Sequence, residues 1–472
     1  MSTANKKGSV AAEKPGDVEV SLFLYRNGTP IAFGDATDFV TFLRTWEVQE
    51  NIAASTIEAR FALEDAGGLI GALTGSEIIK LNVKSQLLDR VYFFRTYGIE
   101  ARSKTNQGTD IYILNACSDE FIKNEVTNLF GHSNTLFNKK TEASQIIKTI
   151  LGKKYLKTDK KLFAEETLNK HSFISPNWRP FDLIYWISQR TIRKAQKGGT
   201  LQNGFAFYEN ALGYHFKSID KMVEDINDQT AEKTNFDDIT GSNTELYTYE
   251  YSPKNTGDKS KDQYKIESVQ FPDEKNFLMG LRHGAWAGYS IGFDPATLAN
   301  SKIGGSEQLQ VDSYKYSIQE MWRYMSHLKS DRCVCPVDLM DKDVQGIINY
   351  PRRVRYTALP NQIFDPKNQK NPQKNYEQLV ELQAYQWMRF ESIKTIKLRV
   401  RIPGNLDLYA GSGVNIIVPT NDGKGDVDKK YSGRYLIGGL QHQCVATTMF
   451  TELYLMKDTI FPELGLVKDD DD

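Results

Sequence analysis

The sequence has little cysteine and little histidine for its length. Four cysteines and six histidines occur in 472 residues, which is too few for the disulfide framework of a small secreted domain. We therefore expect reduced thiols. The nearest approach to a metal-binding pattern is His327 with Cys333 and Cys335. Zinc sites normally have two to four residues between paired cysteines and need four ligands, whereas a single residue separates Cys333 from Cys335. We therefore interpret these cysteines as buried, unliganded thiols and expect no metal and no cofactor.

The sequence also lacks long apolar runs and an excess of charge of one sign. No run approaches the ~20 apolar residues of a membrane-spanning helix, and residues 1–7 lack the apolar core of a secretory signal. We therefore expect synthesis in a reducing cytoplasm. Lys and Arg number 59 against 60 Asp and Glu, a net charge of -1, so no global electric field favours nucleic acid or an anionic membrane.

Familiar catalytic motifs are missing as well. The glycine-rich residues 67–75 lack the lysine and hydroxyl of a phosphate-binding loop, and neither Gly-x-Ser-x-Gly nor His-Glu-x-x-His occurs. A glycosidase needs two carboxylates at a set distance in space, so the 60 acidic residues neither indicate nor exclude one. We predict that the protein is not an enzyme, with a cell-wall hydrolase as the less favoured alternative.

The sequence does contain strand-like patterns near its C-terminus. Residues 396–402 (IKLRVRI) alternate apolar and basic side chains, as a strand with one buried face does. Residues 414–418 (VNIIV), 435–437 (YLI) and 450–456 (FTELYLM) follow, separated by Gly- and Pro-containing breaks. This order predicts a small antiparallel barrel or sandwich.

The same order of events occurs earlier in the chain. Residues 57–63, 75–79, 90–94 and 110–114 match the four later segments in order, with few identical residues. Two interpretations stay open at this point. The chain carries a duplicated unit, or two ordinary antiparallel meanders look alike at this level of detail.

Helical and polar segments lie between the two strand-rich regions. Residues 119–120 begin one helix, and 142–151, 180–196 and 376–392 are further helix candidates. Residues 205–208 and 213–216 predict a hairpin, while 220–262 and 351–374 are polar enough to predict long loops. At ~150 residues per domain the length predicts about three domains, and 40% hydrophobic residues are enough to fill their cores.

We therefore predict an α+β, mainly β, fold with two antiparallel β-barrel or sandwich domains and helical and loop insertions. The expected boundaries are a flexible arm at 1–17, a first barrel at 18–117, a helical domain at 118–200, a hairpin at 201–219 that joins the second barrel, a mixed domain with long loops at 220–375, a helix plus the second barrel at 376–460, and an acidic tail at 461–472.

One group of side chains is a candidate for contact with a partner. Lys397, Arg399 and Arg401 form a basic stripe on a single strand face, which could line a channel or meet an acidic partner. The alternative is a solvated strand face whose charges protect a sheet edge. The acidic run 469–472 is interpreted as a solvated tail.

The order of these segments resembles the baseplate central hub subunits of contractile-tailed, T-even-like bacteriophages, over residues 18–460. The segments that carry the resemblance are 75–83 (GSEIIKLNV), 181–187 (FDLIYWI), 205–208 (FAFY), 404–411 (GNLDLYAG), 435–437 (YLI) and 448–455 (TMFTELYL). The resemblance implies that each barrel is a tail-tube-like domain and that the chain forms a homotrimer with six similar domains in a ring. The polar segments 220–262 and 351–374 and the arm exceed the shorter members of the family, and their contacts are not implied.

The resemblance also implies the partners and the location. The ring would join a hexameric tail-tube protein to a trimeric spike protein in the virion baseplate, contact wedge or other hub proteins, and let DNA pass without binding it specifically. Cell-wall-degrading activity in this family belongs to the spike. A hub of a related contractile injection machine that delivers protein fits the same sequence features.

Overall fold

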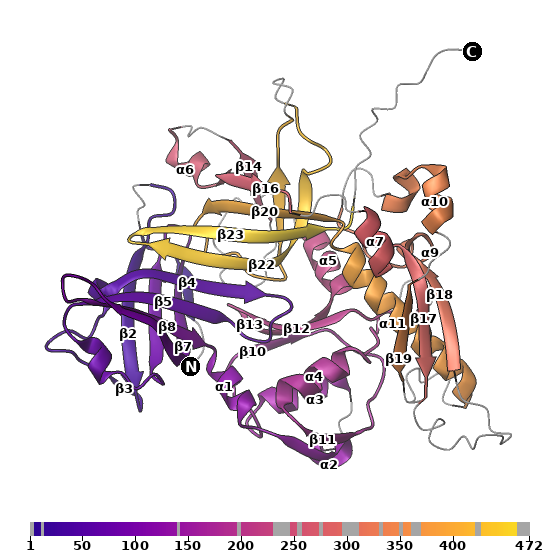
Figure 1. The fold of residues 1–472 in the computed structure, drawn as a ribbon, viewed down its shortest axis with the longest axis horizontal. Coiled ribbons are helices and arrows are strands. Elements are labelled where there is room, and N and C mark those ends of the chain that lie inside the picture. The colour runs from indigo at the N-terminus through magenta and orange to yellow at the C-terminus, as the bar shows by residue number, and fades with distance from the viewer. Residues whose placement is uncertain are drawn as a thin grey trace.

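Figure 1 shows the computed structural model of the chain. It describes residues 4–10, 14–138, 142–195, 200–229, 246–252, 257–272, 277–294, 311–329, 334–348, 353–359, 370–420 and 426–459. Two β-barrels share one 15-stranded sheet, and helical segments pack beside and below them. Among the described helices none is long and apolar enough to cross a membrane.

The first barrel is an antiparallel sheet in the order β4-β5-β8-β7-β6-β2. Its strands are β2 (Glu19–Arg26), β4 (Leu43–Asn51), β5 (Glu58–Asp65), β6 (Ile78–Lys84), β7 (Leu88–Lys104) and β8 (Asp110–Cys117), with the short β3 (Thr29–Pro30) at the edge. Side chains alternate between buried and accessible along β5 and β6, because successive residues of a strand face opposite sides. Phe39 N donates to Leu22 O at 2.7 Å, which holds the short helix η1 (Val40–Phe42) beside β2.

The second barrel repeats this arrangement. Its strands are β14 (Tyr247–Tyr251), β15 (Lys265–Ile266), β16 (Ser268–Gln270), β20 (Ile396–Pro403), β21 (Gly413–Ile417), β22 (Gly433–Val445) and β23 (Thr448–Lys457). The chain at 265–270 closes the barrel, because β15 pairs with β14 and β16 pairs with β20. The core between them contains Val400, Ile416, Tyr435 and Leu453.

The duplication that the sequence suggested is present as a repeated pairing order. β5-β8-β7-β6 in the first barrel corresponds to β20-β23-β22-β21 in the second, with every pair antiparallel. A register shift leaves Tyr97 as the extra residue in β7, and another leaves Gly438 as the extra residue in β22. The residue before each bulge makes the same hydrogen bond in both barrels. Thr96 N donates to Glu77 O just before β6, and Ile437 N donates to Ser412 O just before β21, each at 2.9 Å. The fold class predicted from the sequence is confirmed.

A helical block follows the first barrel. It contains α1 (Asp119–Glu125), α2 (Ser133–Leu136), α3 (Ala143–Leu151), α4 (Pro180–Ser188), the ribbon β9 (Leu129–His132) with β11 (Ile174–Trp178), and the sheet β10 (Lys161–Ala164), β13 (Gly213–Ser218), β12 (Phe205–Asn210). Ile146, Ile184, Phe205 and Tyr214 belong to one buried cluster in this block.

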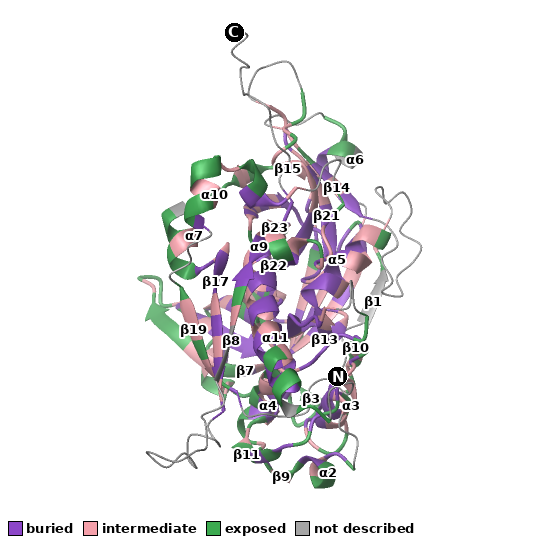
Figure 2. Ribbon diagram, turned by 90° about the vertical axis from the view of Figure 1, so that its right-hand side faces the viewer, coloured by how far each residue is buried: buried purple, intermediate pink, exposed green. Residues whose placement is uncertain are grey.

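A third region is built around one long helix, α11 (Pro372–Ser392). It contains α5 (Ile219–Asp228), α7 (Phe277–His283), α9 (Ile318–Trp322), α10 (Lys342–Ile348), the 3-10 turn η3 (Pro336–Leu339), and the sheet β18 (Val311–Ser317), β17 (Ala287–Phe293), β19 (Val354–Ala358). Two short helices lie elsewhere: η2 (Leu69–Ala72) packs in the first barrel, and α6 (Lys259–Asp262) lies between β14 and β15 of the second. Figure 2 shows buried residues along α11, while more than half of α10 is exposed and β19 is intermediate or exposed. Tyr385 and Met388 of α11 pack with Tyr316 and Met321.

Four expectations about the chain's organisation are corrected, those for the arm, the hairpin and the two loops. The arm at 1–17 includes β1 (Ala4–Lys7), which pairs with β7, and Ser9 Oγ donates to Asp89 at 2.6 Å, so this part of the arm belongs to the sheet. The hairpin at 201–219 pairs through β13 with β10, because Phe205 and Tyr214 fill the helical block's core. Only its other face, with Tyr208, packs toward the second barrel.

The two predicted loops contain regular structure. Residues 220–262 include most of α5, all of β14 and α6, and residues 351–374 include β19 and the start of α11. The Asp and Lys residues of α5 obscure its helical pattern in the sequence, although Met222, Val223 and Ile226 are all buried on one face. Residues 230–245 and 360–369 lie outside the described residues, as does the acidic tail at 461–472.

Candidate functional site: the junction of the two barrels

The two barrels are joined by direct strand pairing. β22 of the second barrel pairs antiparallel with β4 of the first, from Gly439 opposite Asn51 to Val445 opposite Thr45. Gln443 Nε2 donates to Glu47 Oε1 across this line at 3.1 Å. Seven paired positions in register make the sheet continuous from one barrel to the other.

A buried carboxylate lies at this junction. Glu50 of β4 accepts hydrogen bonds from Ala211 N at 2.9 Å and from Ala410 N at 3.0 Å. It therefore ties the first barrel to the hairpin of the helical block and to the second barrel. Burial raises the pKa of Glu50 to about 7, against the opposing effect of the positive charge of Arg90 and the two amides.

A second buried charge cluster joins α11 to its neighbours. Arg389 Nε lies 2.9 Å from Asp220 Oδ1 in α5, and its Nη1 lies 3.3 Å from Asp458 Oδ2 just after β23. All three side chains are fully buried. His327 Nδ1 lies 2.9 Å from the same Asp458 oxygen. Because these groups come from four separate segments, the cluster fixes the long helix against the second barrel.

Sequence reasoning missed these residues, although one signal was available. Trp46, Val48 and Glu50 alternate along β4 and are all buried, so the period of two already placed Glu50 on the inward face. For Arg389 the signal is its place on the apolar face of α11 with Tyr385, which helical spacing predicts.

The predicted basic stripe lies on β20, and its arginines have acidic partners. Arg399 Nη2 lies 2.5 Å from Glu452 Oε2, and Arg401 Nε lies 3.4 Å from Glu267 Oε2. The guanidinium of Arg401 also lies 3.8 Å from the ring centre of Phe450. β20 pairs with β23 along its length and with β16 at Arg399–Arg401, so the two arginines do not lie at an open sheet edge. The role of the stripe stays a prediction. Lys397 lies at the wall of the cavity described next.

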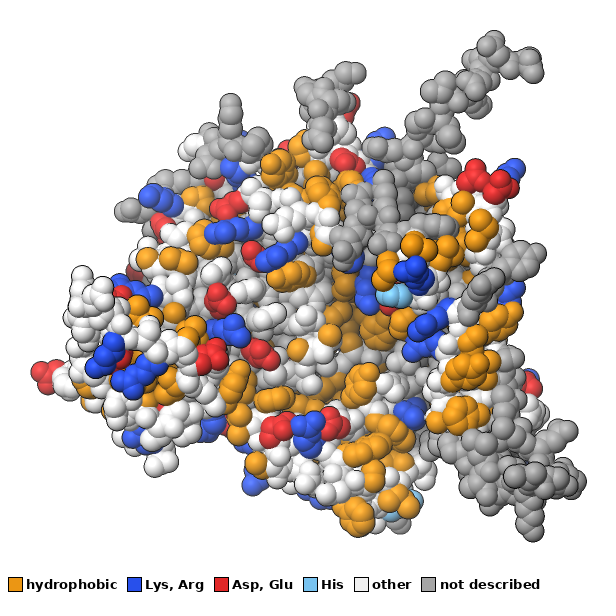
Figure 3. Space-filling view, viewed as in Figure 1, with side chains coloured by type: hydrophobic (Ala, Val, Ile, Leu, Met, Phe, Trp, Pro, Cys, Tyr) orange, Lys and Arg blue, Asp and Glu red, His pale blue; other side chains and the backbone are white. Residues whose placement is uncertain are grey.

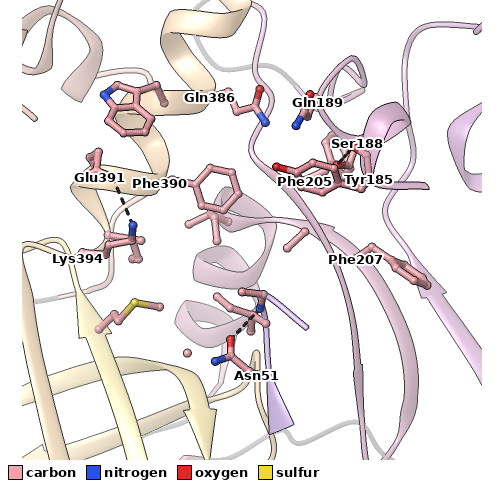
Figure 4. A pocket seen from close by; sticks show the side chains of 18 of the residues that line it. Asn51, Tyr185, Ser188, Gln189, Phe205, Phe207, Gln386, Phe390, Glu391 and Lys394 are labelled. Carbon is pink, nitrogen blue, oxygen red and sulfur yellow. Dashed lines mark hydrogen bonds and ion pairs between the residues drawn. The ribbon is translucent and has the colours of Figure 1, made fainter. Parts of the chain in front are cut away.

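A cavity of about 900 Å³ lies where both barrels, the helical block and α11 meet. Figure 4 shows Phe390 and Gln386 of α11 facing Tyr185 and Gln189 of the helical block across it. Tyr185 is 67% exposed at the wall. Its concave lining combines aromatic and aliphatic side chains with polar ones, which suits an apolar group of a ligand or a partner protein.

No metal-binding arrangement occurs among the residues that the structure describes. They hold no group of three or more His, Cys, Asp or Glu placed to bind a metal ion. Both ring nitrogens of His327 have partners, Asp458 and the carbonyl of Trp322. Cys335 is buried, and Cys333 lies outside the described residues. On the face in Figure 3, acidic and basic side chains are interspersed.

Comparison with known proteins adds evidence on the fold. No family model and no curated protein sequence matches the chain. Among solved structures, the 43 kDa tail protein of prophage MuSo2 from Shewanella oneidensis is similar with a TM-score of 0.50 and 8% identity, covering 93% of this chain and 99% of that one. The chain has the fold of a phage tail protein. The resemblance to tail hub proteins that the sequence suggested is thus confirmed at the level of the fold.

Two weaker similarities belong to the same comparison. The tail protein from Neisseria meningitidis MC58 matches with a TM-score of 0.48 and 9% identity, covering 94% of this chain and 98% of that one. A chain of the Francisella PdpA-VgrG complex matches with a TM-score of 0.44 and 10% identity, covering 95% of this chain and 59% of that one.

Proposed function

We propose that this tail-fold chain is the central hub of a phage baseplate. Three copies form a ring that presents six similar barrels to a hexameric tail tube on one side and holds a trimeric spike on the other. The observation that supports this best is the repeated strand order, β5-β8-β7-β6 and β20-β23-β22-β21, within one continuous sheet. Two like domains per chain are what a threefold ring needs to match a sixfold one.

The role is mechanical in this proposal. The β4–β22 pairing and the buried clusters at Glu50 and Arg389 make each copy a stiff unit that transmits force from the contracting sheath to the spike. After the spike leaves, the ring is the passage for DNA. A passage should not hold a polyanion, and a net charge of -1 with paired arginines on β20 agrees with that.

The deciding experiment is the mass of the assembly. The full chain is measured by native mass spectrometry alone and mixed with the spike protein encoded by the same genome, because some subunits associate only with their partner. We expect a mass that corresponds to three copies. Electron microscopy of the same particles should give class averages with six similar lobes around a channel. A chain that stays monomeric with the spike present would overturn the proposal.

A peptidoglycan assay and the neighbouring genes separate the alternatives. Release of fragments from purified peptidoglycan by the chain alone would favour the hydrolase instead of the hub. Capsid and terminase genes beside the coding sequence support a phage, and their absence beside sheath genes favours an injection machine that delivers protein.

A further inference from the structure

The edge of β7 beyond its bulge carries no strand, among the residues that the structure describes. β6 covers that edge as far as Arg95, and β8 covers the opposite edge through Lys104. Residues 100–104 are all exposed. The equivalent strand β22 is covered by β21 as far as Leu436, and beyond its own bulge the same edge is covered by β4. The second barrel uses this edge of β22 to pair with β4. The equivalent edge of β7 in the first barrel is open among the described residues.

The strand of the second barrel that corresponds to β4 is β16, and within the described ranges one side of β16 is open. β16 pairs with β20 as β4 pairs with β5, in both cases antiparallel. The outer side of β4 is occupied by β22, whereas β16 has no second partner strand within the described part of the chain. Ser268 and Gln270 are exposed there, and the neighbouring Phe271 is 42% exposed.

We propose that β7 of one copy pairs antiparallel with β16 of the next copy, so that the β22–β4 junction recurs between subunits. This inference rests on the proposed function, and it names the surface through which the ring forms. Because the two surfaces differ, the contact is head-to-tail, and such contacts give a closed ring when the rotation per subunit closes. With three copies, three junctions within chains would alternate with three between chains.

The equivalence also gives the register. Ala116 and Leu455 lie beside the two bulges, and the residues five positions earlier, Ile111 and Phe450, pair with Ser103 and Gln443. Ser103 in β7 is thus equivalent to Gln443 in β22.

The same reasoning locates the partner residue. Glu47 pairs with Arg60, which pairs with Asn115 beside the first bulge. Gln270 pairs with Arg399, which pairs with Tyr454 beside the second. Gln270 is therefore equivalent to Glu47. Since Gln443 lies opposite Glu47 within the chain, Ser103 is expected opposite Gln270 of the next copy.

The open edge has features that limit indiscriminate pairing. Ala101 has a φ of 53° at a second irregularity of β7, and Arg102 is held by Asp110 at 3.2 Å. Bulges and charges are common protections of exposed edges. A strand that presents the matching register is the partner that such an edge accepts.

Disulfide trapping tests this pairing. Ser103→Cys and Gln270→Cys are combined with Cys333→Ser, since Cys117, Cys335 and Cys444 are buried. Directly opposed residues of antiparallel strands have Cα atoms ~4.5–5.5 Å apart, within the range that a disulfide spans. We expect mild oxidation of the full chain, with the spike present, to give a covalent series that ends at three copies. Each single-cysteine variant should stay uncross-linked.

A matched control uses a different exposed edge. Thr29→Cys in β3 replaces Gln270→Cys, and Ser103→Cys is kept; this pair should not cross-link. A trimer that forms without a disulfide between positions 103 and 270 would overturn the pairing while the hub stands. Absence of any assembly would overturn the hub itself. A covalent series that continues past three would support the pairing and overturn closure at three.

Discussion

Tyr97 and Gly438 are the extra residues of two bulges at the same position in the two barrels, 341 residues apart in the sequence. A bulge bends its strand and strengthens the local twist. In β22 the strand beyond the bulge turns toward β4 and pairs with it. The corresponding stretch of β7 has one unpaired edge among the described residues. This difference is the basis for the interface proposed above.

The turn before β21 should not tolerate a side chain. Gly411 has a φ of +84°, and an added Cβ would collide with the hydroxyl of Tyr208. The left-handed conformation costs about 1–2 kcal/mol and overpacking typically ~1–3 kcal/mol more. We expect Gly411→Ala to lower the free energy of unfolding by at least about 2 kcal/mol in urea denaturation.

The control for this substitution is Gly28→Ala. Gly28 also has a positive φ, +78°, with no other atom within 4 Å of an added Cβ, so only the conformational cost of about 1–2 kcal/mol applies. Equal losses for the two variants would show that Tyr208 does not crowd Gly411.

The buried charge cluster of α11 should be sensitive to loss of its cation. Arg389→Met leaves Asp220 and Asp458 buried without their counter-charge, and breaking such a pair costs ~3–5 kcal/mol. Arg399→Met is the matched control, because the Arg399 side chain is 40% exposed and that of its partner Glu452 25%. Exposed pairs contribute up to about 1 kcal/mol. Chemical denaturation followed by circular dichroism measures both, and similar losses would contradict the structural role of Arg389.

The stability of the protein should depend on pH through Glu50. Its pKa is raised from 4.5 to about 7 by burial, so the folded state holds a proton that the unfolded state releases between these values. Unfolding then becomes easier as pH rises from about 4.5 to 7, and the penalty persists above 7. At about 1.36 kcal/mol per pKa unit the loss is up to about 3 kcal/mol.

Glu50→Gln isolates this effect, because its side chain does not titrate. Unfolding free energies of both proteins are measured at about pH 5 and about pH 8, on either side of the shifted pKa. We expect the wild type to lose more stability than Glu50→Gln between these two pH values. Parallel behaviour of the two proteins would show that Glu50 does not titrate in this range.

The basic stripe should not bind DNA. Arg399 and Arg401 are already paired with Glu452 and Glu267, and DNA affinity depends on cations that can neutralise phosphates. The variant with Lys397, Arg399 and Arg401 all changed to Gln should match the wild type in fluorescence anisotropy with duplex DNA at about 0.15 M salt. Wild-type binding that the variant loses would assign the stripe to DNA.

The sequence by itself determined the local structure and the order of the two barrels. Alternation along β5, β6 and β20 sets which face of each strand is buried, and the Asn27-Gly28 turn fixes the β2–β3 hairpin, with φ values of 49° and 78°. These features depend on neighbouring residues alone, so they can be inferred from spacing. The absence of a recognised motif likewise turned the interpretation away from catalysis.

Only the tertiary structure decided how the parts are joined. The pairing of β4 with β22, the three-way contact of Glu50 and the cluster at Arg389 bring together segments that are tens to hundreds of residues apart. A strand's pattern shows which side faces the core, but both of its edges carry the same backbone donors and acceptors. Which strand covers an edge is therefore set by the packing of the whole chain, and the open edge of β7 could be seen only once β22 was found covered.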